Sequence, residues 1–253
     1  MSHNLLSGSQ PTEASLDQPL YTPIKRRSFF MYAGATAGAT ALVLAGCSKD
    51  DNNSPGTVNV GSGDVGVLNY AYALEQLEAD FYTQVRTGSY YMGLAAGNAE
   101  KLILDDLYYH EVIHRDFFKA AITAAGATPI KALTTVYPAG TFSSKASVLA
   151  TAKAFEDLGV AAYNGAGRFI TTPLYLVIAG KIVSVEARHA AVIRDLVSEG
   201  TFVGSDVVNL TTATTNNGLS IPSAELSKLP SVVVATANTF LADGSKLDVS
   251  GLG

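Results

Sequence analysis

The chain has 253 residues, of which 47% are hydrophobic and 15% charged, and its formal net charge is -5. That length accommodates one domain with extensions, and the apolar fraction is sufficient for a buried core. The acidic balance, with no basic cluster beyond the N-terminal region, argues against a nucleic-acid partner. The single cysteine excludes a disulfide within the chain.

Residues 1–46 are typical of an export signal. Lys25-Arg26-Arg27-Ser28-Phe29-Phe30 forms a twin-arginine pattern, and the apolar run that follows is shorter than the roughly 20 residues that span a bilayer. The run ends in Leu44-Ala45-Gly46-Cys47, which resembles the lipobox of bacterial lipoproteins. A buried core helix with a coincidental cysteine is the alternative. We predict cleavage before Cys47, which would become the lipid-modified N-terminus.

Residues 47–63 are rich in Ser, Asp, Asn, Gly and Pro, and we expect them to form a flexible tether. Ser48-Lys49-Asp50-Asp51 is similar to the short signal that directs some Gram-negative lipoproteins to the outer cell surface. The expected location is therefore the cell envelope, with the chain lipid-anchored at the periplasmic face or on the outer surface of the outer membrane.

Four stretches then repeat apolar residues every three to four positions, which predicts four amphipathic helices and an all-α core. The predicted helices cover residues 64–86, 98–125, 144–168 and 172–200. Their expected N-caps are Asp64, Asn98, Ser143 or Ser144, and Thr172. No alternation of period two appears in this region.

The connections predict the topology. The third and fourth helices are joined by only a few residues, so they must be antiparallel neighbours, and the link of about a dozen residues between the first two allows the same arrangement. Residues 127–142 connect the two hairpins, and 16 extended residues reach about 50 Å, which exceeds the roughly 40 Å length of such a helix. We therefore expect a long crossover along the bundle.

Residues 201–253 form a C-terminal extension with weaker signals. Asn216-Asn217-Gly218 is typical of a turn, and one short helix is expected near Pro230. We expect this extension to pack on the outside of the bundle and to carry no chemistry.

Two Glu-x-x-His motifs, Glu111 with His114 and Glu186 with His189, lie in the second and fourth predicted helices. Residues three apart share one face of a helix, so each pair can reach the same point. Four-helix bundles hold two metal ions with two such motifs and one further Glu from each remaining helix. One motif alone is common by chance, whereas the paired arrangement predicts a metal site.

The two halves of the bundle match each other internally. Glu75 is followed by Tyr82, and Glu156 by Tyr163, seven residues later in each case, so both halves repeat the order Glu, Tyr, Glu, His. Glu78 aligns with a glycine in the other half, which favours Glu75 as the ligand and places Glu78 beside the site. Tyr82 and Tyr163 are candidate catalytic residues that could donate a hydrogen bond or an electron, although tyrosines on a helix face more often belong to the core.

The predicted ligands are therefore four carboxylates and two imidazoles, those of Glu75, Glu111, His114, Glu156, Glu186 and His189. Their charge of minus four neutralises two divalent ions in an apolar interior. Oxygen and imidazole ligands suit iron or manganese, and the absence of thiolates argues against iron-sulfur or cysteine-bound zinc sites. We predict two Fe or two Mn ions as the cofactor.

The segments Leu74-Glu75-Gln76-Leu77-Glu78-Ala79-Asp80-Phe81-Tyr82 and Val185-Glu186-Ala187-Arg188-His189-Ala190, with Glu111, His114 and Glu156 to Tyr163, resemble the bacterial and fungal ferritin-like proteins often labelled desiccation-related. Bacterioferritin, rubrerythrin and manganese catalase belong to the same superfamily. The resemblance covers residues 64–200. It implies a ferritin-like up-down four-helix bundle with a di-iron or di-manganese centre, and it implies no particular activity.

The chain departs from this family in one respect. Bacterioferritin-like sites carry an acidic residue just before the Glu of each motif, similar to the outer acceptor that a metal-bound His requires. Here those positions hold His110 and Val185. The acceptor is expected to come from elsewhere, with Glu78 as one candidate, and His110 is expected at the surface or at an interface.

Two functions follow as hypotheses. The first is a di-metal oxidoreductase that acts on peroxide, oxygen or Fe(II) in envelope stress protection. The alternative is a non-enzymatic surface or stress protein in which the metals only staple the bundle; storage in a closed cage is disfavoured by the lipid tether. The expected partners are metal ions, a small oxidant and a membrane reached through the lipid alone, and a homodimer is an admissible assembly.

Overall fold

The computed structural model describes residues 56–208 and 225–252. The predicted export signal, Cys47, residues 47–55 of the predicted tether and the Asn216-Asn217-Gly218 turn lie outside these residues. Within the described ranges, no helix combines the length and the apolar character that crossing a membrane requires.

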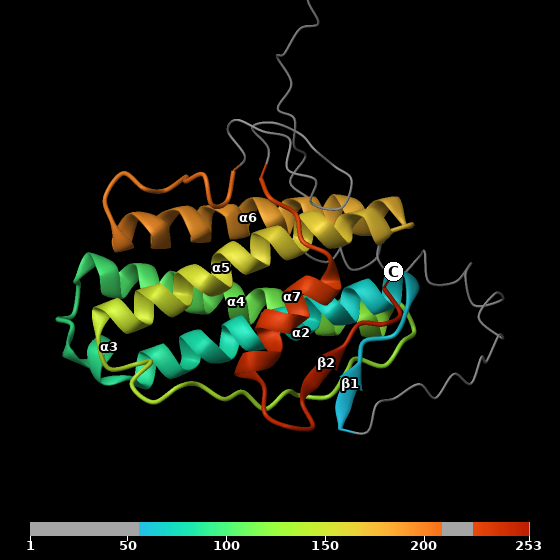
Figure 1. Ribbon diagram of the computed structural model, residues 1–253, viewed down its shortest axis with the longest axis horizontal. Coiled ribbons are helices and arrows are strands. Elements are labelled where there is room, and N and C mark those ends of the chain that lie inside the picture. Colours follow the sequence, from blue (N-terminus) through green and yellow to red (C-terminus); the bar gives the residue numbers. More distant parts are fainter. Residues whose placement is uncertain (1–55, 209–224, 253) are drawn as a thin grey trace, which may run out of the picture. The chain divides into compact units, whose positions relative to one another are not determined.

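Four long helices form a bundle, which confirms the predicted all-α architecture (Figure 1). They are α2 (Gly63–Thr87), α4 (Ala99–Ala124), α5 (Lys145–Ala166) and α6 (Pro173–Val197). Helix α2 packs mainly on α4, and α5 on α6. Most of α2 and α5 is buried, whereas α4 and α6 keep an exposed outer face. The bundle is therefore two helical hairpins that meet along α2 and α5.

Several short elements complete the described chain. They are β1 (Thr57–Asn59), α3 (Ser89–Gly93), the 3-10 helix η1 (Gly167–Phe169), α7 (Pro230–Ala237), the 3-10 helix η2 (Asn238–Phe240) and β2 (Lys246–Asp248).

Side-chain capping explains where α4 and α5 begin. Asn98 accepts hydrogen bonds from the backbone N–H groups of Glu100 and Lys101, and Ser144 forms a reciprocal capping box, as expected. Asp64 differs from the prediction, because the N-cap of α2 is Ser62, two residues earlier. The Asp64 carboxylate instead accepts hydrogen bonds from the backbone N–H groups of Thr171 and Thr172, at 2.7 and 2.9 Å. It thus fixes the start of α6 from the neighbouring hairpin.

The crossover between α4 and α5 runs the length of the bundle beside α2, as its length predicts (Figure 1). Polar side chains of α2 form hydrogen bonds with the backbone of the crossover. Asn69 accepts a hydrogen bond from the N–H of Ile130 at 3.0 Å, and Gln76 accepts one from the N–H of Leu133 at 2.9 Å. These buried amides satisfy crossover N–H groups that would otherwise lack partners in the apolar interior.

The C-terminal extension is more integral than expected. Val233 and Ala237 of α7 have no exposed surface and join the core between α2 and α5. Gly165 in α5 permits this contact, because a Cβ atom there would lie 1.7 Å from the carbonyl oxygen of Lys228. The extension therefore packs on the bundle, with the outer face of α7 exposed, and in addition contributes side chains to the core.

The tether prediction also needs correction at its C-terminal end. Residues 57–59 form β1, which pairs in parallel with β2 near the end of the chain. Val58 and Val60 are buried. An alternation only three residues long is too short to stand out in a polar stretch, and the strand is stabilised by a partner almost 190 residues away.

Candidate metal centre

The bundle brings the six predicted ligands together at the middle of its interior. Helix α2 supplies Glu75, α4 supplies Glu111 and His114, α5 supplies Glu156, and α6 supplies Glu186 and His189. All four glutamates have no exposed surface, and the two histidines are buried. Four carboxylates at this depth require compensating positive charge, because an isolated buried carboxylate is strongly disfavoured.

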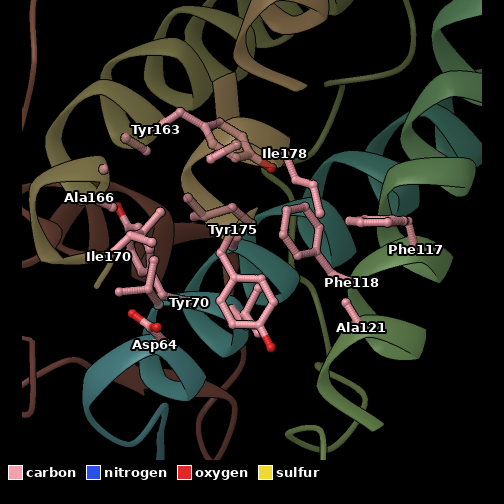
Figure 2. A pocket seen from close by; sticks show the side chains of 17 residues that line it. Asp64, Tyr70, Phe117, Phe118, Ala121, Tyr163, Ala166, Ile170, Tyr175 and Ile178 are labelled. Atoms are coloured by element: carbon pink, nitrogen blue, oxygen red, sulfur yellow. The ribbon is translucent and has the colours of Figure 1, made fainter. Parts of the chain in front are cut away.

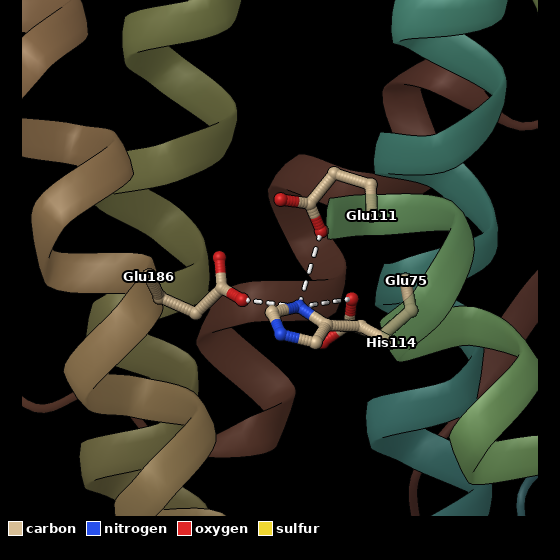
Figure 3. A group of neighbouring side chains, drawn as sticks. All are labelled: Glu75, Glu111, His114 and Glu186. Atoms are coloured by element: carbon tan, nitrogen blue, oxygen red, sulfur yellow. Dashed lines mark ion pairs between the residues drawn. The ribbon is translucent and has the colours of Figure 1, made fainter. Parts of the chain in front are cut away.

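His114 marks the first group of potential ligands (Figure 3). Its Nδ1 atom lies 2.7 Å from Glu186, 3.5 Å from Glu75 and 3.6 Å from Glu111. One ligand atom from each of these four residues lies within 4.8 Å of the others, which suits a single metal ion.

His189 marks the second group, which mirrors the first. Its Nδ1 atom lies 2.7 Å from Glu111, 3.5 Å from Glu156 and 3.5 Å from Glu186. Glu111 and Glu186 belong to both groups. These two residues are therefore placed to bridge a pair of metal ions, with Glu75 and Glu156 as the outer carboxylates.

The two tyrosines connect the hairpins in a reciprocal way. Tyr82 of α2 donates a hydrogen bond to Glu156 of α5, and Tyr163 of α5 donates one to Glu75 of α2. Each tyrosine thus orients the outer carboxylate of the other hairpin rather than that of its own helix. The bond occupies one oxygen, Oε1, of each outer glutamate and leaves Oε2 facing the cluster.

The unpaired atoms of the cluster match a two-metal site. Eight buried side-chain atoms of the six residues have no hydrogen-bond partner among the described residues: one oxygen each of Glu75 and Glu156, both oxygens of Glu111 and Glu186, and Nδ1 of His114 and His189. Buried polar atoms are normally satisfied. Two metal ions would each take one outer oxygen, one oxygen from each bridging carboxylate and one imidazole nitrogen, which accounts for all eight.

The family model for the ferritin-like domain matches residues 63–199. The chain belongs to the ferritin-like family. A search of curated proteins found no match. The matched residues contain the four long helices and all six ligand candidates, so the ferritin-like domain carries a buried cluster of carboxylates and histidines compatible with metal binding.

Without metal, protons take the place of cations in this ferritin-like cluster. Burial lowers the pKa of His114, but the close carboxylates of Glu111, Glu186 and Glu75 outweigh it and raise the pKa to about 12. The pKa of His189 is raised in the same way. Burial raises the pKa of Glu111, but ion-pair contacts with the two histidines lower it to about 2. Both imidazoles are thus cationic at neutral pH, and each points its Nδ1 proton at three carboxylates.

The outer and neighbouring carboxylates shift the opposite way. Burial raises the pKa of Glu156 to about 7, against the lowering effect of His189. Burial and the charge of Glu186 raise the pKa of Glu75 well above its ordinary value. In the metal-free cluster, protons on the imidazoles and on these outer carboxyls therefore supply the compensation that divalent cations would supply.

His110 is placed to serve as the outer hydrogen-bond acceptor of His189. Its Nδ1 atom lies 2.8 Å from Nε2 of His189, so a neutral His110 can accept the hydrogen bond that His189 donates when its Nδ1 binds a metal. Burial, together with the charge of His189, lowers the pKa of His110 and favours this neutral form. His110 is exposed, as predicted, but its contact with His189 was missed, and no hydrogen bond from Glu78 to either histidine is found among the described residues. The position of His110 directly before Glu111 is the sequence feature that could have indicated this role.

Glu78 lies beside the cluster and belongs to neither ligand group. Its side chain is buried, and burial followed by the charges of Glu111 and Glu186 raises its pKa well above the ordinary value. The glycine that aligns with it, Gly159, makes room for it: a Cβ atom at residue 159 would lie 2.9 Å from Oε1 of Glu78. The internal repeat is therefore broken at a position where one half carries a carboxylate and the other gives it space.

Proposed function

We propose that this ferritin-like protein binds two iron or two manganese ions in the buried cluster and uses them as an oxidoreductase toward peroxide, oxygen or Fe(II). The observation that carries the proposal is the set of eight unpaired ligand atoms in two overlapping groups, each of three carboxylates and one imidazole. The six ligands carry four negative charges with neutral imidazoles, which two divalent ions neutralise. Oxygen-rich sites with imidazole favour iron or manganese.

The residues divide the work between holding metal and orienting ligands. Glu111 and Glu186 would bridge the two ions, and Glu75 and Glu156 would each complete one of them. Tyr82 and Tyr163 hold the outer carboxylates through one oxygen and, as proposed catalytic residues, lie one hydrogen bond from the metal ligands. When bound, the metal pair would supply the electrons for reducing peroxide or oxygen.

Elemental analysis of the full chain, purified without added metal, tests metal binding. About two equivalents of iron or manganese are expected per chain, and both should be lost in the Glu111→Ala, Glu186→Ala double variant with helical content retained. Glu199→Ala, which removes an exposed carboxylate just after α6, is the matched control. A folded chain that takes up neither Fe(II) nor Mn(II) would rule the proposal out.

Turnover is a separate measurement on the loaded protein. Consumption of hydrogen peroxide or dioxygen, absent in the double variant and retained in Glu199→Ala, would support the oxidoreductase. A loaded protein that consumes neither and does not oxidise Fe(II) would leave the metals with a stapling role alone.

We also propose that the protein is exported and lipid-anchored at Cys47, where it would serve stress protection at the cell envelope. The twin-arginine pattern, the short apolar run and the Leu44-Ala45-Gly46-Cys47 segment occur in the order that an exported lipoprotein requires. Cys47→Ser should move the protein from the membrane fraction to the soluble fraction, whereas Ser48→Ala should not. An unchanged distribution in Cys47→Ser would contradict the anchor.

A further inference from the structure

A small cavity lies within the bundle on the side of the cluster toward the start of α2. All four long helices line it, including Ala71 of α2, Phe118 and Ala121 of α4, Tyr163 of α5 and Ile178 of α6 (Figure 2). Ala71 precedes Glu75 by one helical turn, and Phe118 follows His114 by one turn. The cavity, named here the Tyr163 cavity, is therefore next to the metal ligands along the bundle axis.

The size of the Tyr163 cavity restricts what it can hold. Its volume is about 40 Å³. One water molecule needs roughly 10–15 Å³, and a cavity that binds benzene has about 150 Å³. The Tyr163 cavity therefore accepts a molecule of two or three heavy atoms and excludes an aromatic ring.

The chemistry of its walls restricts the occupant further. The surface of the cavity is formed almost entirely by carbon atoms. The one carboxylate that borders it, Asp64, accepts hydrogen bonds from the backbone N–H groups of Thr171 and Thr172. Water and hydrogen peroxide would lose hydrogen bonds on entering such a site, whereas an apolar molecule would not. Dioxygen meets both the size and the polarity of the cavity.

Tyr163 joins this cavity to the metal ligands. Its ring lines the cavity, and its hydroxyl donates a hydrogen bond to Glu75, so one side chain lies between the cavity and the cluster. Its counterpart in the repeat, Tyr82, has no exposed surface and lies against Phe81, at 5.1 Å between ring centroids. The two tyrosines therefore differ in their surroundings: Tyr163 lines a cavity, whereas Tyr82 is enclosed by its neighbours.

We infer that the Tyr163 cavity is a binding site for dioxygen and that the oxidant approaches the metal centre from the Tyr163 side of the bundle. The identity of the occupant rests on the proposed function. The cavity and its preference for a small apolar molecule rest on the structure alone.

Xenon binding to the metal-free full chain tests the cavity independently of turnover. Xenon is an apolar probe of suitable size, and one site is expected from the change in ¹²⁹Xe chemical shift or from a xenon-pressurised crystal. Ala121→Phe should abolish it, and Ala120→Phe, which adds the same ring at an exposed position beside it, should leave it unchanged. Ala179→Phe fills the same cavity from α6 and serves if the first variant does not fold. Absence of a xenon site, or its persistence in the filled variants, would overturn the inference.

Reaction of the metal-loaded protein tests the occupant. Ala121→Phe should slow the reaction with dioxygen by about tenfold or more relative to the reaction with hydrogen peroxide, while Ala120→Phe leaves the ratio unchanged. Equal slowing of both reactions would contradict selection by the cavity. Loss of the xenon site with an unaltered dioxygen rate would refute this inference alone, whereas a loaded protein inert to both oxidants would refute the proposed function and with it the assignment of dioxygen.

Discussion

His110 and His189 are joined through Nδ1 and Nε2 at 2.8 Å, so the residue that precedes one Glu-x-x-His motif supports the histidine of the other. No comparable partner is found among the described residues for Nε2 of His114. The two halves of the metal centre therefore share a ligand set but differ in the support that each imidazole receives.

His110→Ala should lower the affinity for one of the two metal ions and leave the affinity for the other unchanged. Removal of an outer partner of a metal-bound histidine costs about 10–100-fold in affinity, so titration of the metal-free protein with Mn(II) should show one tight and one weakened site. Ile113→Ala, at an exposed position of the same helix, is the control. Two sites of unchanged affinity in His110→Ala would show that the contact does not support the metal.

The reciprocal tyrosine contacts predict that removing either hydroxyl destabilises the metal-free protein. Tyr82→Phe leaves an oxygen of the fully buried Glu156 without its donor, which should lower the free energy of unfolding by about 1–3 kcal/mol. Tyr163→Phe should cost a similar amount, because it leaves an oxygen of the fully buried Glu75 without its donor. Urea denaturation of both variants measures the loss, and unchanged stability in either variant would contradict the contact.

Glu78 and Gly159 predict a coupled pair of substitutions. Gly159→Ala alone should destabilise the protein, since the new methyl group would lie 2.9 Å from a carboxylate oxygen that is packed in the core. In a Glu78→Ala background the same change should stabilise by up to about 1 kcal/mol, the difference in helix propensity between glycine and alanine. Urea denaturation of the four proteins gives the coupling energy. Independent effects of the two changes would show that the glycine does not serve Glu78.

Much of the fold follows from local signals. Apolar periodicity locates the four long helices, and Asn98 and Ser144 mark helix starts because their side chains satisfy N–H groups of the next turn. The prediction of Asp64 as an N-cap was wrong, because a carboxylate near a helix start can equally accept hydrogen bonds from another segment. The strand β1 could not be predicted, since its partner β2 lies almost 190 residues further along the chain.

In the site, too, some features follow from local sequence and others depend on contacts between distant segments. The spacing of Glu111 and His114, repeated by Glu186 and His189, specifies which residues can converge, because i and i+3 share a helix face. The contacts between hairpins depend on how far one helix is displaced along the other, which spacing within a helix does not encode. For this reason the bond from Tyr82 to Glu156 and the role of His110 emerge only from the three-dimensional structure.

A rise in pH should destabilise the metal-free protein and stabilise the metal-loaded protein. In the metal-free protein the pKa of His114 is raised to about 12 and that of Glu156 to about 7, so the folded state holds protons that the unfolded chain releases. Such stabilisation is complete below the unfolded pKa of each group and is lost as pH rises toward the folded value. Between pH 5 and 8 the metal-free protein should therefore lose stability, by up to about 1.4 kcal/mol per pH unit for each group that is protonated only when folded.

Bound metal should reverse this trend, because the ions require neutral imidazoles and ionised carboxylates and so displace these protons. With Mn(II) in excess, the urea midpoint should rise between pH 5.5 and 7.5, whereas it should fall over the same range with EDTA. The Glu111→Ala, Glu186→Ala variant should show no response to Mn(II). A metal-free protein that gains stability across this range would contradict protonated His114 and Glu156 in the folded state, and parallel curves with and without Mn(II) would show that metal does not compete with those protons.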